Sequence, residues 1–198
     1  MCLRLAAFVV LVGAAAVGSG CNKDGGGTSS SAGPTAPSPS NPATPVSQNG
    51  CSATFACPNT NAQGNANPST PTFERLTLTT GTSASCRADL FRNSQSPPIP
   101  VEFTIRNPIR NFTWRSRLGD PSLLSMTPNM GLADTAGPFQ TSAAFSSGGL
   151  GGLSSGLTFS QNLILEIIDT GPNSPPFASA PALAACGVTV WGIVTPGR

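Results

Sequence analysis

Hydrophobic and polar residues alternate with a period of two in several short stretches of the chain. The clearest alternation lies in residues 101–106, VEFTIR, where Val101, Phe103 and Ile105 occupy every second position. Successive side chains of a β-strand point to opposite faces, so this pattern predicts a strand with one buried face. Comparable runs occupy residues 73–80, 86–92, 112–117, 163–168 and 187–194. Residues 163–168 are the most apolar of these runs and are predicted to form a central strand.

Turn-forming residues separate these runs. The chain contains 22 Gly and 20 Pro among 198 residues, which is enough for a turn between every pair of predicted strands. No long stretch has a helical period, and one short helix is predicted at residues 180–185 with Pro181 in its first turn. Six or seven short strands predict an all-β domain that forms an antiparallel β-sandwich. An immunoglobulin-like arrangement is favoured, with a small barrel or a jelly roll as the alternative.

Residues 140–160, QTSAAFSSGGLGGLSSGLTFS, interrupt the strand pattern with Gly and Ser. They contain neither the Lys of a P-loop nor the glycine spacing of a dinucleotide site. We expect a long connecting loop or a weak hairpin here.

The N-terminal part of the chain has a different pattern. After Arg4, residues 5–17 contain no charged or strongly polar side chain. A transmembrane helix needs about 20 apolar residues, so this shorter run predicts the apolar region of a secretory signal peptide that comprises residues 1–20. Residues 22–50 consist mainly of Gly, Ser, Pro, Thr and Ala, a composition that predicts a disordered spacer. The folded domain is therefore expected at residues 51–198.

The small residues Gly18, Ser19 and Gly20 directly precede Cys21. This arrangement resembles the processing box of bacterial lipoproteins, although Gly18 stands where that family prefers Leu. The resemblance implies that the signal peptide is cut before Cys21, whose thiol and new amino terminus are acylated. Asp after the acylated cysteine commonly retains such a protein at the inner membrane, so Asn22 implies the outer membrane where the cell has one. The alternative is ordinary secretion without lipid.

Five cysteines lie at or beyond the predicted cleavage site: Cys21, Cys51, Cys57, Cys86 and Cys186. Lipid on Cys21 would leave four, which predicts two disulfides in an exported protein. Three pairings are open to four cysteines. We favour Cys51–Cys57 with Cys86–Cys186, and a Cys57–Cys86 bond is the runner-up. Because the chain has no His and no Cys-x-x-Cys pair, zinc is not favoured, and neither a metal nor a cofactor is expected.

Composition excludes several classes of catalysis. The absence of His rules out a Ser-His-Asp triad and the usual zinc hydrolase sites. A Ser-Lys hydrolase would need a lysine in the folded domain, but the single lysine, Lys23, lies in the spacer. A pair of carboxylates could still serve a glycoside hydrolase. The candidates in the folded part are Glu74, Asp89, Glu102, Asp120, Asp134, Glu166 and Asp169. We expect each to be solvated or paired with Arg.

Arginine and aromatic residues alternate in and around residues 112–117. Phe112 and Trp114 would share one face of a strand, and Arg115 and Arg117 the other, as in a half-buried strand with a polar outer face. The alternative is a ligand surface for an anionic glycan or lipid headgroup, formed by Arg115, Arg117 and Trp191. Nucleic acid is not an expected partner, because nine Lys and Arg (ten less Arg4) face eight Asp and Glu from Cys21 onward.

These patterns together predict a lipid-anchored, exported, non-enzymatic β-sandwich with a structural or adhesive role at a bacterial cell envelope. We expect a monomer whose partners are the membrane and a glycan or envelope protein. A carbohydrate-binding module that stacks Trp114 or Trp191 on sugar rings is the second hypothesis. A carboxylate-only glycoside hydrolase is the third.

Overall fold

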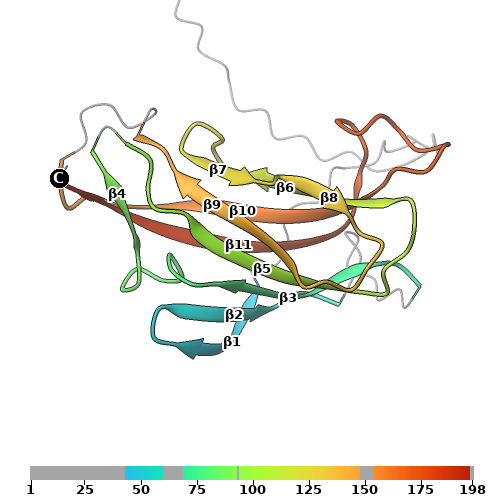
Figure 1. Cartoon of the computed structure of the whole chain (residues 1–198), viewed down its shortest axis with the longest axis horizontal. Helices are drawn as coiled ribbons and strands as arrows, with labels where there is room; N and C mark the ends of the chain where they lie inside the picture. The colour runs from blue at the N-terminus through green and yellow to red at the C-terminus, as the bar shows by residue number, and fades with distance from the viewer. Residues whose placement is uncertain (1–42, 60–68, 93, 148–153, 197–198) are drawn as a thin grey trace, which may run out of the picture. The chain divides into compact units, whose positions relative to one another are not determined.

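The computed structural model describes residues 43–59, 69–92, 94–147 and 154–196, which form two β-sheets and no α-helix. The six-stranded sheet contains, in spatial order, β1 (Thr44–Asn49), β2 (Ser52–Ala56), β3 (Thr72–Leu78), β5 (Ile99–Arg106), β9 (Phe139–Phe145) and β7 (Leu124–Thr127). The five-stranded sheet contains β4 (Ala88–Phe91), β11 (Ala182–Thr195), β10 (Thr158–Asp169), β6 (Phe112–Leu118) and β8 (Met130–Leu132) (Figure 1).

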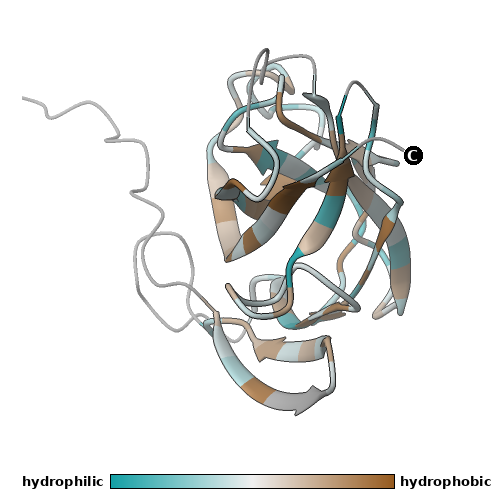
Figure 2. Ribbon diagram, turned by 90° about the vertical axis from the view of Figure 1, so that its left-hand side faces the viewer, coloured by the Kyte–Doolittle hydropathy of each residue, from teal (hydrophilic) through white to brown (hydrophobic). Residues whose placement is uncertain are grey.

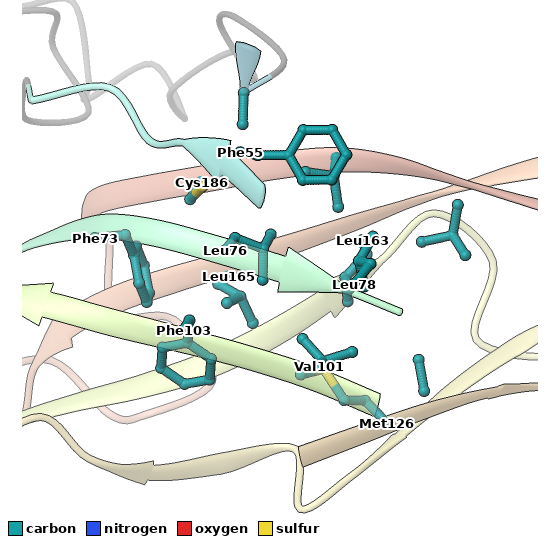
Figure 3. Packing of buried hydrophobic residues seen from close by; sticks show 14 of the residues in the cluster. Phe55, Phe73, Leu76, Leu78, Val101, Phe103, Met126, Leu163, Leu165 and Cys186 are labelled. Carbon is teal, nitrogen blue, oxygen red and sulfur yellow. The ribbon is translucent and has the colours of Figure 1, made fainter. Parts of the chain in front are cut away.

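The core lies between the inner faces of these two sheets. Val101, Phe103 and Ile105 of β5 are each 1% exposed, so the predicted alternation of this strand is confirmed. Leu165 and Ile167 of β10, in the other sheet, are fully buried members of the same core cluster. Figure 3 shows Leu165 near Phe103 and Val101. Hydrophobic and hydrophilic residues alternate along several strands in Figure 2. Burial of these apolar side chains is the main stabilising contribution to the fold.

The strand order is that of an immunoglobulin-like sandwich. The order β3-β5-β9-β7 corresponds to the ABED sheet, and β11-β10-β6 corresponds to GFC, with β8 added beside β6. Strand β4 joins the same sheet parallel to β11. Two features depart from the simple pattern. First, β1 and β2 extend the six-stranded sheet. Second, β7, at the position of strand D, precedes β8 in the chain, whereas in immunoglobulin domains the strand added beside strand C precedes strand D. The predicted immunoglobulin-like β-sandwich is thus confirmed.

Two predictions of secondary structure within the described residues were wrong. The helix predicted at residues 180–185 is the start of β11, in which Ala182, Ala184 and Cys186 are buried on alternate positions. Ala185 pairs with Glu166 of β10, and this tertiary pairing overrides the helical propensity of alanine. The loop predicted at residues 140–160 contains most of β9 and the first residues of β10.

The folded part also begins earlier than predicted. Thr44–Asn49 was assigned to the spacer, but it forms β1 and pairs antiparallel with β2. The backbone N–H of Ala43 donates to Gly187 of β11, and Ala43 is buried. Backbone pairing has no strong compositional signature, which explains why these polar residues resembled the spacer.

The disulfides are Cys51–Cys86 and Cys57–Cys186, with Cα atoms 5.4 Å and 5.3 Å apart. The favoured pairing was therefore wrong, as was the runner-up. Cys51 and Cys57 flank β2, and at about 3.3 Å per residue their Cα atoms are roughly 20 Å apart, well beyond the reach of a disulfide. Cys86 lies just before β4. The parallel register of β4 on β11 places Cys86 near Val190, which is roughly 13 Å from Cys186 along β11, too far for the predicted Cys86–Cys186 bond. The two disulfides indicate an oxidising, extracytoplasmic environment.

Candidate recognition surfaces

The most polar buried group lies on the outer face of the five-stranded sheet. Glu166 of β10 is 2% exposed and pairs in register with Arg115 of β6. Its Oε2 atom accepts from Nε of Arg115 at 2.8 Å, and its Oε1 atom lies 3.2 Å from Nε of Arg117. Two guanidinium groups therefore compensate the buried carboxylate, as a charge in this position requires.

Arg115 also fastens the segment that connects β10 and β11. Its Nη1 atom donates to the carbonyl oxygen of Phe177 at 2.6 Å, and its Nη2 atom donates to that of Ala180 at 3.0 Å. The guanidinium carbon lies 5.6 Å from the centroid of the Phe177 ring. The donors of Arg115 are thus engaged by the protein itself. We call Arg115, Glu166 and the contacts of Arg115 with Phe177 and Ala180 the arginine clip.

The three residues predicted as a ligand surface share this outer face but are not brought together. The strand register places Arg117 beside Ile164, which pairs with Gly187. Trp191 lies four residues further along β11, roughly 13 Å away. Trp191 is half-buried, and Arg117 has a side chain that is 48% exposed. Arg117 is therefore the more accessible of the two arginines, and besides its ion pair with Glu166 the register leaves Trp191 too far away to form an aromatic platform beside it.

Trp114 is a core residue. It is 3% exposed, and its ring lies 5.0 Å from that of Phe103 in an edge-to-face arrangement. Phe139 stacks on Phe103, with ring centroids 5.1 Å apart, and also contacts Trp114 edge to face at 6.4 Å. Trp114 occupies the strand that carries the buried Trp of immunoglobulin domains, and an aromatic partner takes the place of their disulfide. Its indole is unavailable for stacking on a sugar.

A groove of about 570 Å³ lies where β6 begins, β10 ends and β11 begins. Its lining residues are Ile109, Arg110, Asn111, Phe112, Asp169, Gly171, Pro172, Asn173, Ser174, Pro175, Pro181 and Leu183. Asn111 and Thr170 join its two sides, since the Thr170 N–H donates to the Asn111 carbonyl at 2.8 Å. The lining combines apolar side chains, amide groups, one cation (Arg110) and one carboxylate (Asp169), and such a mixture can hold a small polar ligand by hydrogen bonds.

The groove does not contain a pair of carboxylates. Asp169 is the one carboxylate among its lining residues, and its Oδ1 atom accepts the Gly171 N–H at 2.8 Å. A glycoside hydrolase uses two carboxylates across one cleft.

The other candidate carboxylates have local structural partners or stand on the surface. Glu74 pairs with Arg106 at 3.3 Å, and Glu102 accepts from Gln140. The hydroxyl and the backbone N–H of Ser122 hold the pKa of Asp120 below its ordinary value. Asp89 and Asp134 are exposed.

Two edge strands expose apolar side chains that sequence reasoning missed. Met130 and Leu132 of β8 are 47% and 63% exposed, and Val46 of β1 is 58% exposed. Both strands lie at the edge of their sheets. The sequence signal was weak, because β8 has only three residues and contains a glycine.

Cys21 and the segment that precedes it lie outside the described residues. In the part of the chain that the structure describes, no helix is long and apolar enough to cross a membrane. Within that same part, His, Cys, Asp and Glu do not form a cluster of three that could hold a metal ion.

Comparison with known proteins provides no family for this chain. No family model and no curated protein sequence matches it. Among solved structures, the Caenorhabditis elegans protein SSP-19 is described as an MSP-domain protein like family member. It is 11% identical to this chain, with a TM-score of 0.34, over 55% of this chain and 94% of that one. The Salmonella enterica SafA pilin in complex with the SafB chaperone is 14% identical, with a TM-score of 0.34, over 61% of this chain and 54% of that one.

Proposed function

We propose that the protein is an exported lipoprotein whose β-sandwich has a non-enzymatic, structural or recognition role at a bacterial cell envelope. The observation that carries this proposal is the use of cysteine. Cys51, Cys57, Cys86 and Cys186 all form disulfides within the fold. Cys21 is then the one cysteine of the exported part without a bond in the sandwich, and it lies directly after small residues that resemble a lipoprotein processing box.

The position of the fold relative to Cys21 supports the same role. Ala43 is the first described residue that contacts the sandwich, which leaves residues 22–42 between Cys21 and this contact. A Gly/Ser-rich coil of that length spans about 25 Å, and a polyproline II segment spans about 65 Å. Such a spacer would hold the sandwich clear of a membrane surface while the acyl chains remain in the outer membrane.

Intact-mass analysis of the membrane-extracted protein tests the anchor. We expect the native chain to begin at Cys21 and to carry the added mass of acyl groups, together with the loss of four hydrogens for two disulfides. Cys21→Ser should lack the acyl mass and leave the membrane fraction. Cys2→Ser is the matched control and should leave mass and fraction unchanged. A native chain that is cleaved elsewhere and carries no acyl mass would refute the proposal.

Recognition through the outer face of the five-stranded sheet has less support. Arg115 is engaged in the arginine clip, Trp114 is buried and Trp191 is half-buried. Arg117 is the candidate residue that keeps an accessible cation. Retention of Arg117→Ser on anionic polysaccharide or anionic lipid vesicles, compared with the native chain, measures its contribution. Equal retention would remove this surface from consideration.

A further inference from the structure

Strand β8 forms an open edge of the five-stranded sheet, beside β6 (Figure 1). Native edge strands usually carry charges or prolines that discourage pairing with another chain. β8 instead exposes Met130 and Leu132, and Leu132 is the most exposed large hydrophobic residue among those described. Both side chains project from the outer face, because Gly131 between them faces the indole of Trp114.

The hydrogen-bond pattern of β8 determines which backbone groups are free. The Ser116 N–H donates to the Asn129 carbonyl at 2.8 Å, and the Ala133 N–H donates to the Phe112 carbonyl at 2.9 Å. Residues 129, 131 and 133 therefore direct their N–H and C=O groups toward β6, because hydrogen-bonded positions alternate in an antiparallel pair. The corresponding groups of Met130 and Leu132 point away from β6 and have no partner among the described residues.

This edge is complementary to itself. If a second copy lies antiparallel with Gly131 opposite Gly131, Met130 stands opposite Leu132 of the second copy, and Leu132 opposite its Met130. Each such pair can form two backbone hydrogen bonds, so four free donors and four free acceptors are satisfied. Gly131 falls at the non-hydrogen-bonded position, where Cα atoms approach to about 4.5 Å and a residue without a side chain fits best.

The flanking charges favour the same register. Asp134 follows β8 at one end, and Arg117 of β6 lies near the other end, because Met130 pairs with Arg115 and the Ser116 N–H donates to Asn129. In an antiparallel pair, the end followed by Asp134 in one copy therefore lies beside the end near Arg117 in the other. Asp134 is exposed and has no ion pair among the described residues, while the side chain of Arg117 is 48% exposed. The two-fold axis would produce this attraction twice. Pro128 lacks an N–H group, so the pairing ends after three residues and the interface is small.

We propose that β8 is a self-association site, through which two copies join their five-stranded sheets edge to edge in a weak, reversible dimer. The apolar contacts between Met130 and Leu132 and the four hydrogen bonds carry the interaction. The predicted monomer is then the dissociated form. This inference does not depend on lipid attachment, because it concerns the sandwich alone.

Cross-linking tests the register directly. The full chain carrying Cys2→Ser and Cys21→Ser provides a background without free thiols outside the disulfides. Met130→Cys and Leu132→Cys are prepared separately in this background and then mixed under mild oxidation. We expect a covalent heterodimer in the mixture, because Cα atoms of a hydrogen-bonded pair lie about 5.5 Å apart, within disulfide range.

Each cysteine variant alone is the control. Two copies of Met130→Cys would place the thiols on diagonal positions, where Cα atoms are about 8 Å apart and a disulfide does not form readily. Cross-linking in the mixture should therefore exceed that of either variant alone by about tenfold or more. Equal cross-linking in all three samples would show unspecific contact and overturn the proposal.

Sedimentation equilibrium of the same Cys2→Ser, Cys21→Ser chain measures the association itself. Leu132→Lys introduces like charges on both copies and should lower the association constant by about tenfold or more. Val46→Lys is the matched control, because Val46 is similarly exposed on the edge of the other sheet, and it should leave the constant unchanged. Circular dichroism verifies that both variants are folded. A chain that remains monomeric at millimolar concentration, or equal effects of the two substitutions, would refute the site.

Discussion

At the scale of single residues, the arginine clip contains a buried charge, the carboxylate of Glu166. Glu166 is buried on a face where its neighbours Ile164 and Ile168 are also buried, so its charge has little access to water. Arg115 compensates that charge and at the same time satisfies two carbonyl groups of the β10–β11 connection. A lysine in place of Arg115 could not reproduce this arrangement, because the three contacts use the planar fork of the guanidinium group.

Replacement of Glu166 by Gln should therefore be costly. The substitution leaves two guanidinium groups without a carboxylate, and we expect the free energy of unfolding to fall by about 2–4 kcal/mol in urea denaturation. Glu74→Gln is the matched control, since Glu74 and Arg106 form an exposed pair whose loss should cost at most about 1 kcal/mol. Similar losses for the two variants would contradict the role assigned to the arginine clip.

At the scale of strands, the accuracy of sequence reasoning depended on which interaction forms an element. β5 and the second half of β11 were predictable because alternate residues face a core, and the run predicted at residues 187–194 is a strand in which Val188, Val190 and Val194 are buried. The same holds for Trp114 on the inner face of β6. Strands β1 and β8 depend on backbone pairing with a neighbour. β1 consists mostly of polar residues and β8 has only three residues, so neither sequence carries a clear trace of such pairing.

Long-range geometry was equally inaccessible from sequence. Which cysteines pair depends on which strands lie side by side. Cys51 and Cys57 are close in sequence, but the extended strand β2 between them keeps them too far apart for a disulfide. The candidate surface shows the same limit. The prediction that Arg115 and Arg117 lie on the polar outer face of one strand is confirmed. Only the strand register reveals that Arg115 is engaged by Glu166 and that Trp191 lies far along the sheet.

The packing of β8 on β6 depends on the absence of a side chain at Gly131. A Cβ atom there would lie 2.7 Å from Nε1 of Trp114, a rigid and buried ring. We expect Gly131→Ala to destabilise the protein by about 1–3 kcal/mol and to change the tryptophan fluorescence of the folded state. Gly187→Ala serves as the control, because its nearest neighbour would be Cγ1 of Ile164 at an ordinary 3.6 Å. An unchanged stability for Gly131→Ala would show that β8 can shift freely.

At the scale of the whole sandwich, the two sheets are joined covalently as well as by their core. Cys57 directly follows β2 of the six-stranded sheet, and Cys186 lies within β11 of the five-stranded sheet. Cys51–Cys86 connects the turn between β1 and β2 to the segment that precedes β4. Both bonds therefore attach the additional strands β1 and β2 to the immunoglobulin-like core.

The two disulfides should differ in their contribution to stability. They close loops with sequence separations of 129 and 35 residues, and chain entropy favours the longer loop. We expect Cys57→Ala with Cys186→Ala to lower the free energy of unfolding by about 4–5 kcal/mol, and Cys51→Ala with Cys86→Ala by about 3–4 kcal/mol. Thermal and urea unfolding of the two double variants would compare them. A larger loss for the shorter loop would show that native packing, rather than loop length, dominates.

The Cys57–Cys186 bond also has a mechanical consequence. A pull applied between the N-terminal segment and the C-terminus enters the fold at β1 and leaves it at β11, so the load passes across this bond. The chain between the two cysteines cannot lengthen while the bond is intact, although a sequence separation of 129 corresponds to roughly 450 Å of extended chain if it is released. A domain that is tethered at one end and pulled at the other could therefore not extend the chain between Cys57 and Cys186 until a reductant cleaves the bond.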